Sequence, residues 1–275
     1  MNRNMKPMKL ATLLLPLLLG AGPAMAQLAP GPGAAPAAVA ATASQLDTIM
    51  ARGVLRVGVT GDYRPFSIKT ADGGLEGLDV DMAGSLATAL GVKLELVPTT
   101  WGTLLADLKA GRFDVGMGGI SVTLERQRQA LFSTPVLRTG KAPIALCTNQ
   151  ARFGTMEGID RPDVRAIVNP GGTNERFARA TLKQAQIVVF PSNAAIFDEL
   201  VAGRADVMMT DSVETRLQAK LHPELCAINP DRPLDFGELA YLLPRDAVLK
   251  DFVDQWLHIS TETGERARLA AKWIP

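Results

Sequence analysis

A short segment at residues 118–126 combines the residue types that bind a carboxylate. It contains two adjacent glycines, followed by Ser121, Thr123 and Arg126, and Gly119 is the second of the two glycines. A guanidinium beside exposed backbone N–H groups forms a planar, bidentate site for an acid. Arg126 is therefore the candidate anchor of an acidic ligand, and the alternative is an arginine on a solvated helix face.

A second polar segment, Asn-Pro-Gly-Gly-Thr-Asn-Glu at residues 169–175, leads into a predicted helix. Gly172, Thr173 and Asn174 would lie at the helix N-terminus, where unpaired N–H groups and the helix dipole favour anions. The segment lacks the Lys-Ser/Thr pair of a P-loop and the third glycine of a dinucleotide fingerprint. We therefore expect it to hold a small anionic or polar ligand.

Glu175 is the carboxylate in this segment that could take part in a reaction. In the first turn of a helix, an acidic side chain stabilises the helix by about 0.3–1 kcal/mol, which explains Glu175 without any function. A general acid must instead hold its proton. Closure of a cleft would have to desolvate Glu175 and raise its pKa against the helix dipole.

Four further residues could line the same site. Asp211 follows a predicted strand and could either receive a ligand ammonium group or cap the next helix, whereas Asp79 is expected to be a helix cap. Tyr63, Phe66 and Trp101 could form a wall for an apolar ring, and core packing is the alternative for such scarce aromatic residues.

The chain has two cysteines, Cys147 and Cys226, and two histidines. In an oxidising compartment the cysteines could form a disulfide, and the alternative is two buried thiols. His222 and Cys226 are four residues apart, but His258 is the only other histidine and zinc needs three or four ligands. We therefore expect no metal site.

The elements that would position these residues alternate between short aliphatic strands and amphipathic helices. This alternation is typical of α/β folds in which helices cover sheets with parallel strands. In the first half of the chain the predicted strands are 54–59, 92–97 and 113–117, and the predicted helices are 79–90 and 103–109.

One helix–turn–strand unit occurs twice. Residues 104–115 resemble residues 196–207 at a constant offset of 92, and in each copy a helix ends at Ala-Gly-Arg before Asp-Val begins a strand. Chance recurrence of a common unit is possible. We favour two homologous α/β lobes, since a solenoid would need more copies.

The C-terminal helix has an apolar stripe that needs a sheet to cover, and the first lobe has too few helices of its own. The stripe includes Val248, Leu249, Val253 and Trp256. The chain would then cross between lobes twice, forming a hinge below a ligand cleft. The expected organisation is a leader at 1–26, a disordered Ala/Pro linker at 27–43, lobe 1 at 44–140 with 244–275 returning to it, crossover 1 at 141–147, lobe 2 at 148–236 and crossover 2 at 237–243.

The N-terminus resembles a secretory leader. It has a basic start, an apolar run over 10–19 and Ala24-Met25-Ala26, so cleavage after Ala26 is expected. The apolar run is too short to span a bilayer, so we expect no membrane anchor. Removing 26 of 275 residues leaves 249, enough for two lobes.

The composition indicates a folded, exported chain without affinity for nucleic acid. Apolar residues make up 47%, aromatic residues 5% and charged residues 21%. The formal net charge is +1, and removing Arg3, Lys6 and Lys9 with the leader leaves −2. No basic surface for nucleic acid is implied.

These features together resemble the periplasmic amino-acid-binding proteins of ABC transporters. The resemblance rests on the leader, the two lobes, Pro65-Phe66, Trp101, the run Ile-Ser-Val-Thr-Leu-Glu-Arg at 120–126 and Thr210-Asp211. It implies a type II two-lobed fold with two parallel-rich sheets, a hinge of two crossovers and a ligand cleft. Within that superfamily, Gly-Asp-Tyr-Arg-Pro-Phe-Ser at 61–67, Asn-Pro-Gly-Gly-Thr-Asn-Glu at 169–175 and Leu-His-Pro-Glu-Leu-Cys at 221–226 resemble the periplasmic cyclohexadienyl dehydratases.

The second resemblance implies a lyase that converts prephenate to phenylpyruvate and arogenate to phenylalanine without a cofactor. Arg126, Thr123 and the backbone of 119–121 would hold a substrate carboxylate, Thr173 and Asn174 would add hydrogen bonds, and Glu175 would be the general acid. Asp211 would suit the ammonium group of arogenate. The alternative is a transport receptor that binds an amino acid, and the sequence gives no indication of oligomeric state.

Overall fold

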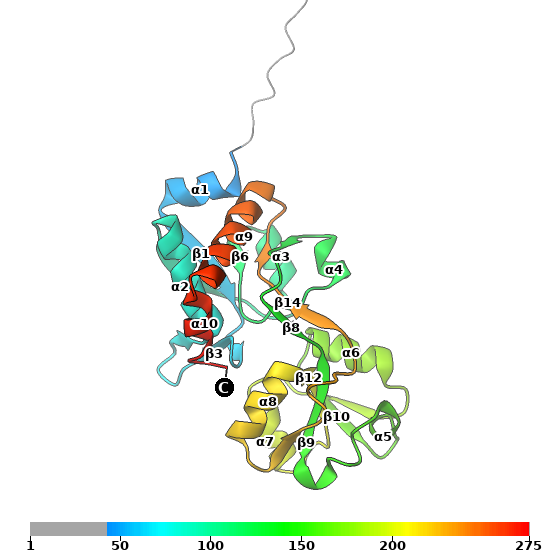
Figure 1. The fold of residues 1–275 in the computed structure, drawn as a ribbon. Coiled ribbons are helices and arrows are strands. Elements are labelled where there is room, and N and C mark those ends of the chain that lie inside the picture. The colour runs from blue at the N-terminus through cyan, green and yellow to red at the C-terminus, as the bar shows by residue number, and fades with distance from the viewer. Residues whose placement is uncertain (1–42, 275) are drawn as a thin grey trace, which may run out of the picture. The chain divides into compact units, whose positions relative to one another are not determined.

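The computed structural model of the chain describes residues 43–274 (Figure 1). The expected leader at 1–26 and all but the last residue of the expected linker at 27–43 lie outside this range. Within the described range, no helix combines the length and the apolar character needed to cross a membrane.

The first lobe is built on a five-stranded mixed sheet. Strands β5, β1 and β6 are parallel, and β15, which comes from the far end of the chain, pairs antiparallel with both β6 and β7. The strands of this sheet are β1 (Val54–Val59), β5 (Lys93–Pro98), β6 (Val115–Gly116), β7 (Leu131–Phe132) and β15 (Leu242–Leu243). A small antiparallel sheet beside it comprises β2 (Asp62–Tyr63), β3 (Ser67–Lys69) and β4 (Leu75–Glu76).

Helices from both ends of the chain pack on the first lobe (Figure 1). The apolar stripe of the long C-terminal helix covers this lobe as predicted, because Leu249, Val253 and Trp256 are buried in the same core as Leu55. Val248 is an exception, since it is 53% exposed. The helices are α1 (Gln45–Arg52), α2 (Leu78–Leu90), α3 (Leu104–Lys109), α4 (Leu124–Gln127), α9 (Ala247–Glu262) and α10 (Glu265–Ala270).

The second lobe repeats the strand arrangement of the first. Parallel strands β10 and β11 connect through the Ala166–Val207 bridge to the antiparallel strands β12, β9 and β13. The strands are β9 (Lys141–Leu146), β10 (Arg165–Val168), β11 (Gln186–Val189), β12 (Met208–Asp211) and β13 (Leu225–Ala227). The helices are η1 (Cys147–Asn149), α5 (Met156–Ile159), α6 (Thr173–Thr181), α7 (Ile196–Val201) and α8 (Ser212–Leu221).

The predicted repeat occupies equivalent places in the two lobes. Helices α3 and α7 each end before a glycine in the left-handed region, Gly111 with φ 64° and Gly203 with φ 67°. In the first lobe, Asp114 accepts hydrogen bonds from the backbone N–H and the guanidinium of Arg56. In the second lobe, Asp206 binds Arg165 in the same way. The aspartate of each Asp-Val pair therefore fixes the start of the neighbouring strand.

The chain passes between the lobes through two paired strands, β8 (Leu137–Thr139) and β14 (Gly237–Leu239). The first crossover was expected at 141–147, but Lys141–Leu146 form β9, the central strand of the antiparallel part of the second lobe. The second was expected at 237–243, and of these residues Leu242 and Leu243 belong to the first-lobe sheet. Each crossing strand thus leads directly into the strand that runs antiparallel in the next sheet.

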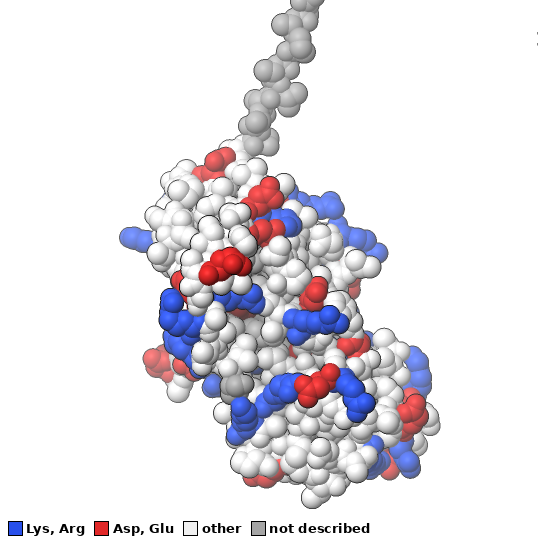
Figure 2. All heavy atoms as spheres, viewed as in Figure 1, with Lys and Arg blue, Asp and Glu red and all other residues white. Residues whose placement is uncertain are grey.

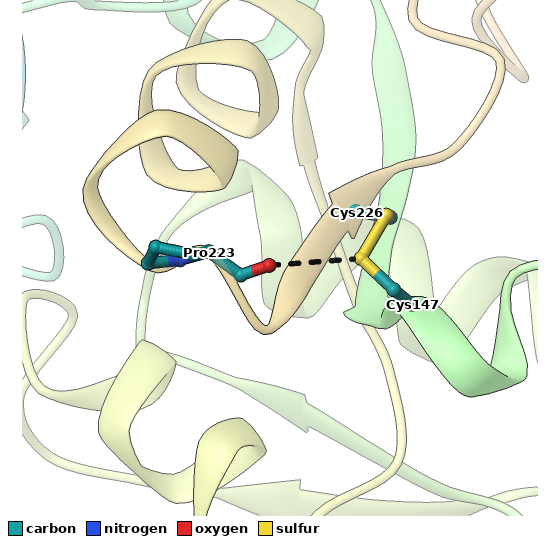
Figure 3. Close-up of a disulfide and its surroundings, with 3 residues drawn as sticks. All are labelled: Cys147, Pro223 and Cys226. Carbon is teal, nitrogen blue, oxygen red and sulfur yellow. Dashed lines mark hydrogen bonds between the residues drawn. A yellow bond between two sulfur atoms is a disulfide. The ribbon is translucent and has the colours of Figure 1, made fainter.

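The two cysteines form a disulfide within the second lobe (Figure 3). Cys147 begins η1 directly after β9, and Cys226 lies in the neighbouring strand β13, with Cα atoms 4.8 Å apart. Of the two alternatives that the sequence left open, pairing is the one observed.

Charged side chains of both signs are mixed over the face of the molecule in Figure 2. Many are paired locally, as in Arg204 with Glu199 at 2.6 Å and Arg216 with Asp231 at 2.6 Å. The viewed face therefore has no basic stripe that would follow a phosphate backbone.

Candidate functional site

A small cavity lies where loops of the two lobes meet. Its volume is about 20 Å³, which is room for about one water molecule. Eight of the residues expected at the site line it: Tyr63, Trp101, Gly119, Ser121, Gly172, Thr173, Asn174 and Asp211. Asn169 and Asn193 also line it and were not expected, whereas Phe66, Thr123, Arg126 and Glu175 do not line it.

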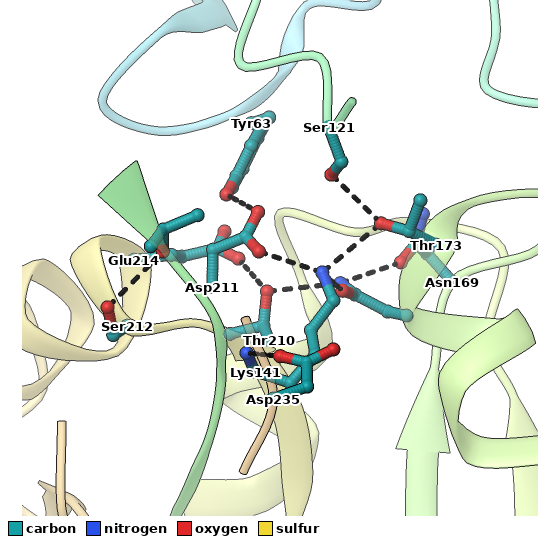
Figure 4. Close-up of polar contacts among 12 residues, drawn as sticks. Tyr63, Ser121, Lys141, Asn169, Thr173, Thr210, Asp211, Ser212, Glu214 and Asp235 are labelled. Atoms are coloured by element: carbon teal, nitrogen blue, oxygen red, sulfur yellow. Dashed lines mark hydrogen bonds and ion pairs between the residues drawn. The ribbon is translucent and has the colours of Figure 1, made fainter. Parts of the chain in front are cut away.

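Asp211 is the centre of a buried polar cluster at the base of this cavity (Figure 4). It ends β12, and one carboxylate oxygen accepts a hydrogen bond from Lys141 Nζ at 2.8 Å. The other oxygen accepts from Tyr63 Oη at 2.5 Å. The sequence left two roles open for Asp211, binding a ligand ammonium group or capping the next helix. Its side chain makes no capping hydrogen bond to α8, and its carboxylate binds the ammonium group of Lys141.

Lys141 begins β9 directly opposite Asp211 in the antiparallel register and is 5% exposed. Besides Asp211, its ammonium group donates to Thr173 Oγ1 at 3.1 Å and to Asn174 Oδ1 at 2.6 Å. All three hydrogen-bonding positions of the ammonium group are therefore used. The cluster joins β9 and β12 to the start of α6.

Glu214 lies beside this cluster, in the first turn of α8, and is 1% exposed. Burial raises its pKa well above the usual range, and the negative charge of Asp211 adds to this effect. A hydrogen bond from Thr210 Oγ1, at 2.5 Å, and the charge of Lys141 oppose the rise and are outweighed. Glu214 is thus a carboxyl group whose environment favours the protonated form.

Glu175 has the opposite environment. Its carboxylate accepts hydrogen bonds from the Gly171 backbone N–H at 2.7 Å and from Arg179 Nε at 2.9 Å. These two hydrogen bonds, the backbone one first, hold its pKa below the usual range. A general acid must hold a proton, whereas the surroundings of Glu175 in this structure lower its pKa. The side chain caps the N-terminus of α6 instead.

Arg126 is buried behind the cavity, 2% exposed, on the short helix α4. The Thr123 hydroxyl caps this helix by accepting from the Arg126 backbone N–H at 3.2 Å. The guanidinium donates to the Ser121 carbonyl at 2.8 Å and makes no ion pair within residues 43–274. Burial lowers its pKa to about 10, with a contribution from the charge of Arg176. A desolvated, unpaired guanidinium of this kind has strong affinity for an anion.

Part of the backbone that was expected to help Arg126, the N–H of Gly119, is already bound. The N–H groups of Gly118 and Gly119 donate to Asp79 Oδ2 at 2.8 and 2.7 Å. Asp79 is therefore not the helix cap that its position suggested. It is 2% exposed, and burial raises its pKa to about 6. Its role is to fix the turn that leads to Ser121.

The aromatic residues divide into one core residue and two that face the cavity. Phe66 is 1% exposed and belongs to the first-lobe core, so it is not part of a ligand wall. Tyr63 and Trp101 line the cavity edge to face, with ring centroids 5.9 Å apart. Gly119 has φ 72°, and a Cβ there would lie 2.5 Å from atoms of the Phe66 and Tyr63 rings. Only glycine permits this close packing.

Direct contacts between the lobes surround the cavity. Ser121 Oγ and Thr173 Oγ1 are 3.1 Å apart, and Asn193 Nδ2 donates to the Asp62 carbonyl at 3.0 Å. Asn193 is 2% exposed, and its Oδ1 has no hydrogen-bond partner within the described residues. Residues 43–274 also contain no group of three or more His, Cys, Asp or Glu side chains placed to hold a metal ion.

The sequence of the chain matches a known protein family. The family model of the bacterial extracellular solute-binding proteins, family 3, matches residues 55–275. This chain belongs to that family. The two-lobed α/β fold predicted from the sequence is thereby confirmed.

Comparison with individual relatives indicates which members of the family this chain is most similar to among those compared. A cyclohexadienyl dehydratase from Pseudomonas aeruginosa is 58% identical over 240 residues, which are 87% of this chain and 90% of the relative. The L-cystine-binding protein TcyJ from Escherichia coli is 32% identical, over 60% of this chain and 62% of the relative. The resemblance to the cyclohexadienyl dehydratases that the sequence suggested is confirmed.

Solved structures agree with this placement. An ancestral amino-acid-binding protein, described as a precursor of cyclohexadienyl dehydratase, is 37% identical, with a TM-score of 0.79 over 84% of this chain and all of that one. An ancestral cyclohexadienyl dehydratase is 50% identical, with a TM-score of 0.54 over 85% of this chain and 97% of that one.

Two residues of the buried cluster, Lys141 and Glu214, were missed by reasoning from the sequence. Lys141 is the one charged residue in the strand Lys-Ala-Pro-Ile-Ala-Leu, and a charge in such a strand was a usable signal. Glu214 follows Asp211 by three residues on a predicted helix, which resembles ordinary helix capping. Its burial depends on the packing of α8 and could not be read from that spacing.

Proposed function

We propose that this protein is a periplasmic cyclohexadienyl dehydratase, a carbon–oxygen lyase exported by a leader cleaved after Ala26. It would convert prephenate to phenylpyruvate and arogenate to phenylalanine, releasing water and carbon dioxide. The observation on which the proposal rests is Glu214, a buried carboxyl group with a raised pKa beside the cavity between the lobes. A fold-level likeness alone would not separate an enzyme from a receptor.

The reaction needs one proton donor and no redox chemistry. In both substrates the ring hydroxyl lies opposite a carboxylate. Protonated Glu214 gives its proton to the hydroxyl as the C–O bond breaks and water leaves. The electron pair of the ring–carboxylate bond moves into the ring as carbon dioxide departs, and the ring becomes aromatic. Solvent then returns a proton to Glu214. A positioned general acid accelerates such a step by about 10²–10⁴-fold.

We propose Glu214 as the donor because burial raises its pKa, whereas hydrogen bonds from Gly171 and Arg179 lower the pKa of Glu175. Glu214 does not itself line the small cavity. It is linked to the lining through Thr210 Oγ1, which accepts from Asn174 Nδ2 at 3.0 Å. A cavity of about 20 Å³ cannot hold a substituted six-membered ring, so the lobes must part to admit substrate. We propose that they move about β8 and β14 and then reclose with the hydroxyl against Glu214.

The other residues of the site bind and orient the substrate. The buried guanidinium of Arg126 attracts a substrate carboxylate because it has no carboxylate partner of its own. Ser121 and Thr173 approach each other from opposite lobes and supply hydroxyl groups. Tyr63 and Trp101 offer an aromatic wall to the ring. Exclusion of water from the closed cleft leaves the departing carboxylate less stabilised.

An amino-acid receptor is the competing function, and Asp211 argues against it. A receptor of that kind needs a carboxylate free for the ligand ammonium group, whereas both oxygens of Asp211 are bound by Lys141 and Tyr63. The test is to incubate the purified protein with prephenate and to measure phenylpyruvate. Formation of phenylpyruvate with saturation kinetics is expected. Tight binding of an amino acid with no product from prephenate or arogenate would refute the proposal.

A further inference from the structure

Arg176 is a second guanidinium at the cleft, and it approaches Arg126 from the opposite lobe. Arg176 lies in the first turn of α6, in the second lobe, whereas Glu125 and Arg126 lie on α4, in the first. Its Nε is 3.8 Å from Glu125 Oε2, and its Nη1 donates to the Gly171 carbonyl at 3.3 Å. Both contacts are long, so most of its donors remain available to a ligand.

The two guanidinium groups are close enough to repel each other. The pKa of Arg126 is lowered first by burial and next by the charge of Arg176. Two cations held together in this way are unfavourable unless an anion lies between them. Glu125 is a poor counter-ion because its side chain is 52% exposed, so solvent screens its charge.

The space beside Arg176 is large enough for part of a ligand. A groove of about 310 Å³ adjoins the small cavity and shares Ser121, Thr173 and Asp211 with it. Arg176 lines this groove.

The other charged residues that line this groove are already paired. Lys141 is neutralised by Asp211, and Asp235 Oδ1 accepts from the Lys141 backbone N–H at 2.5 Å. Of the two cations that line this groove within the described residues, Lys141 has Asp211 at 2.8 Å, whereas the counter-ion of Arg176, Glu125, is 3.8 Å away.

We propose that Arg176 is a second carboxylate-binding residue, so that the closed cleft selects dicarboxylates, with one carboxylate at Arg126 and the other at Arg176. This inference rests on the proposed function, since prephenate and arogenate both have two carboxylates. It adds a binding residue from the second lobe, and it gives a reason for the lobes to close. A dianion placed between the guanidinium groups replaces their repulsion by two attractions.

The test compares two inert ligands that differ in one carboxylate, 4-carboxyphenylpyruvate and phenylpyruvate. Dissociation constants are measured by calorimetry, which needs no turnover. Arg176→Gln is expected to weaken binding of the dicarboxylate by about 10-fold and binding of the monocarboxylate by less than about 2-fold. Glu125→Gln is expected to tighten binding of the dicarboxylate by about 2-fold, because it frees Arg176.

The matched control is Arg179→Gln. Arg179 lies on the same helix three residues further on, its side chain is 57% exposed and it pairs with Glu175. This variant changes the net charge equally and is expected to leave both dissociation constants within about 2-fold. Thermal melting of each variant verifies that it folds.

Three results would overturn the inference. They are equal weakening of the two ligands by Arg176→Gln, an effect of Arg179→Gln as large as that of Arg176→Gln, and no preference of the wild-type protein for the dicarboxylate. Failure of the wild-type protein to turn over prephenate is a separate result. It would refute the dehydratase function while the binding comparison still decides the role of Arg176.

Discussion

The phenol of Tyr63 donates a hydrogen bond to Asp211 across the cleft, with 2.5 Å between Oη and Oδ2. Tyr63 belongs to β2 of the first lobe and Asp211 ends β12 of the second, and each is 4% exposed. Burial raises the pKa of Tyr63 well above 10, so the phenol remains a donor throughout the physiological range. Closure of the lobes therefore completes the hydrogen bonding of the same carboxylate that neutralises Lys141.

Tyr63→Phe is expected to lower kcat/KM for prephenate by about 10-fold, because one oxygen of buried Asp211 loses its partner. The ring itself would stay packed on Phe66, with centroids 5.1 Å apart as in the native protein. Tyr241→Phe is the matched control, since the Tyr241 hydroxyl contacts Asp79 at 3.3 Å within the first lobe and does not join the lobes. Equal effects of the two variants on kcat/KM would contradict the proposal that the Tyr63 hydroxyl stabilises the closed arrangement of the lobes.

The identity of the proton donor is tested by comparing two Glu→Gln variants. Glu214→Gln is expected to lower kcat by about 10²–10⁴-fold, because the amide cannot protonate the leaving hydroxyl. Glu175→Gln removes a carboxylate from the first turn of α6 and its ion pair with the exposed Arg179, and it is expected to change kcat by less than about 3-fold. The measurement is steady-state phenylpyruvate formation, with calorimetric binding of phenylpyruvate to show that the site is intact. A large loss of kcat in Glu175→Gln, with Glu214→Gln unaffected, would reverse the assignment.

Much of the fold could be predicted from local patterns. The repeat of Ala-Gly-Arg and Asp-Val at an offset of 92 indicated two similar lobes, because a helix that ends at a left-handed glycine is set by near neighbours in sequence. The antiparallel strands β9 and β15 could not be predicted in this way. Each joins its sheet only after the chain has crossed between the lobes, so its pairing depends on tertiary structure.

The site was predicted less completely, for a related reason. Glycine-rich turns and strand ends identified eight residues that line the cavity, including Thr173 and Asp211, since ligand loops follow strands in such folds. The pKa of a carboxyl group, however, depends on burial and on partners that are distant in sequence. Glu175 and Glu214 both occupy the first turn of a helix, and only three-dimensional packing distinguishes the half-buried, hydrogen-bonded carboxylate of Glu175 from the fully buried Glu214.

The disulfide is expected to stabilise the second lobe. It joins cysteines 79 residues apart, and a cross-link over a loop of this length removes conformational freedom from the unfolded chain. Replacing both Cys147 and Cys226 by Ser is expected to lower the free energy of unfolding by about 2–4 kcal/mol. Urea denaturation of the two proteins measures this, and the wild-type protein in reductant should approach the double variant. Identical unfolding curves with and without reductant would show that the bond contributes nothing to stability.

The buried carboxyl of Asp79 predicts a specific dependence of stability on pH. Its pKa in the folded protein is about 6, against about 3.9 for an unfolded chain. The folded state therefore binds a proton more readily, so the stabilisation from this group is complete below about pH 4 and is lost as the pH rises through 6. The groups that face Asp79 are Tyr241, Arg266 and Tyr63, and burial raises the pKa of both tyrosines well above 10.

The comparison that isolates this effect is Asp79→Asn, whose amide oxygen can still accept from Gly118 and Gly119. Urea unfolding of both proteins at pH values from 4 to 7 gives the difference in their free energies of unfolding. Relative to the variant, the wild-type protein is expected to lose about 2 kcal/mol over that range. Other titrating groups are common to the two proteins and cancel in the difference. A difference in the free energies of unfolding that stays constant with pH would contradict this prediction. It would show that burial does not raise the pKa of Asp79.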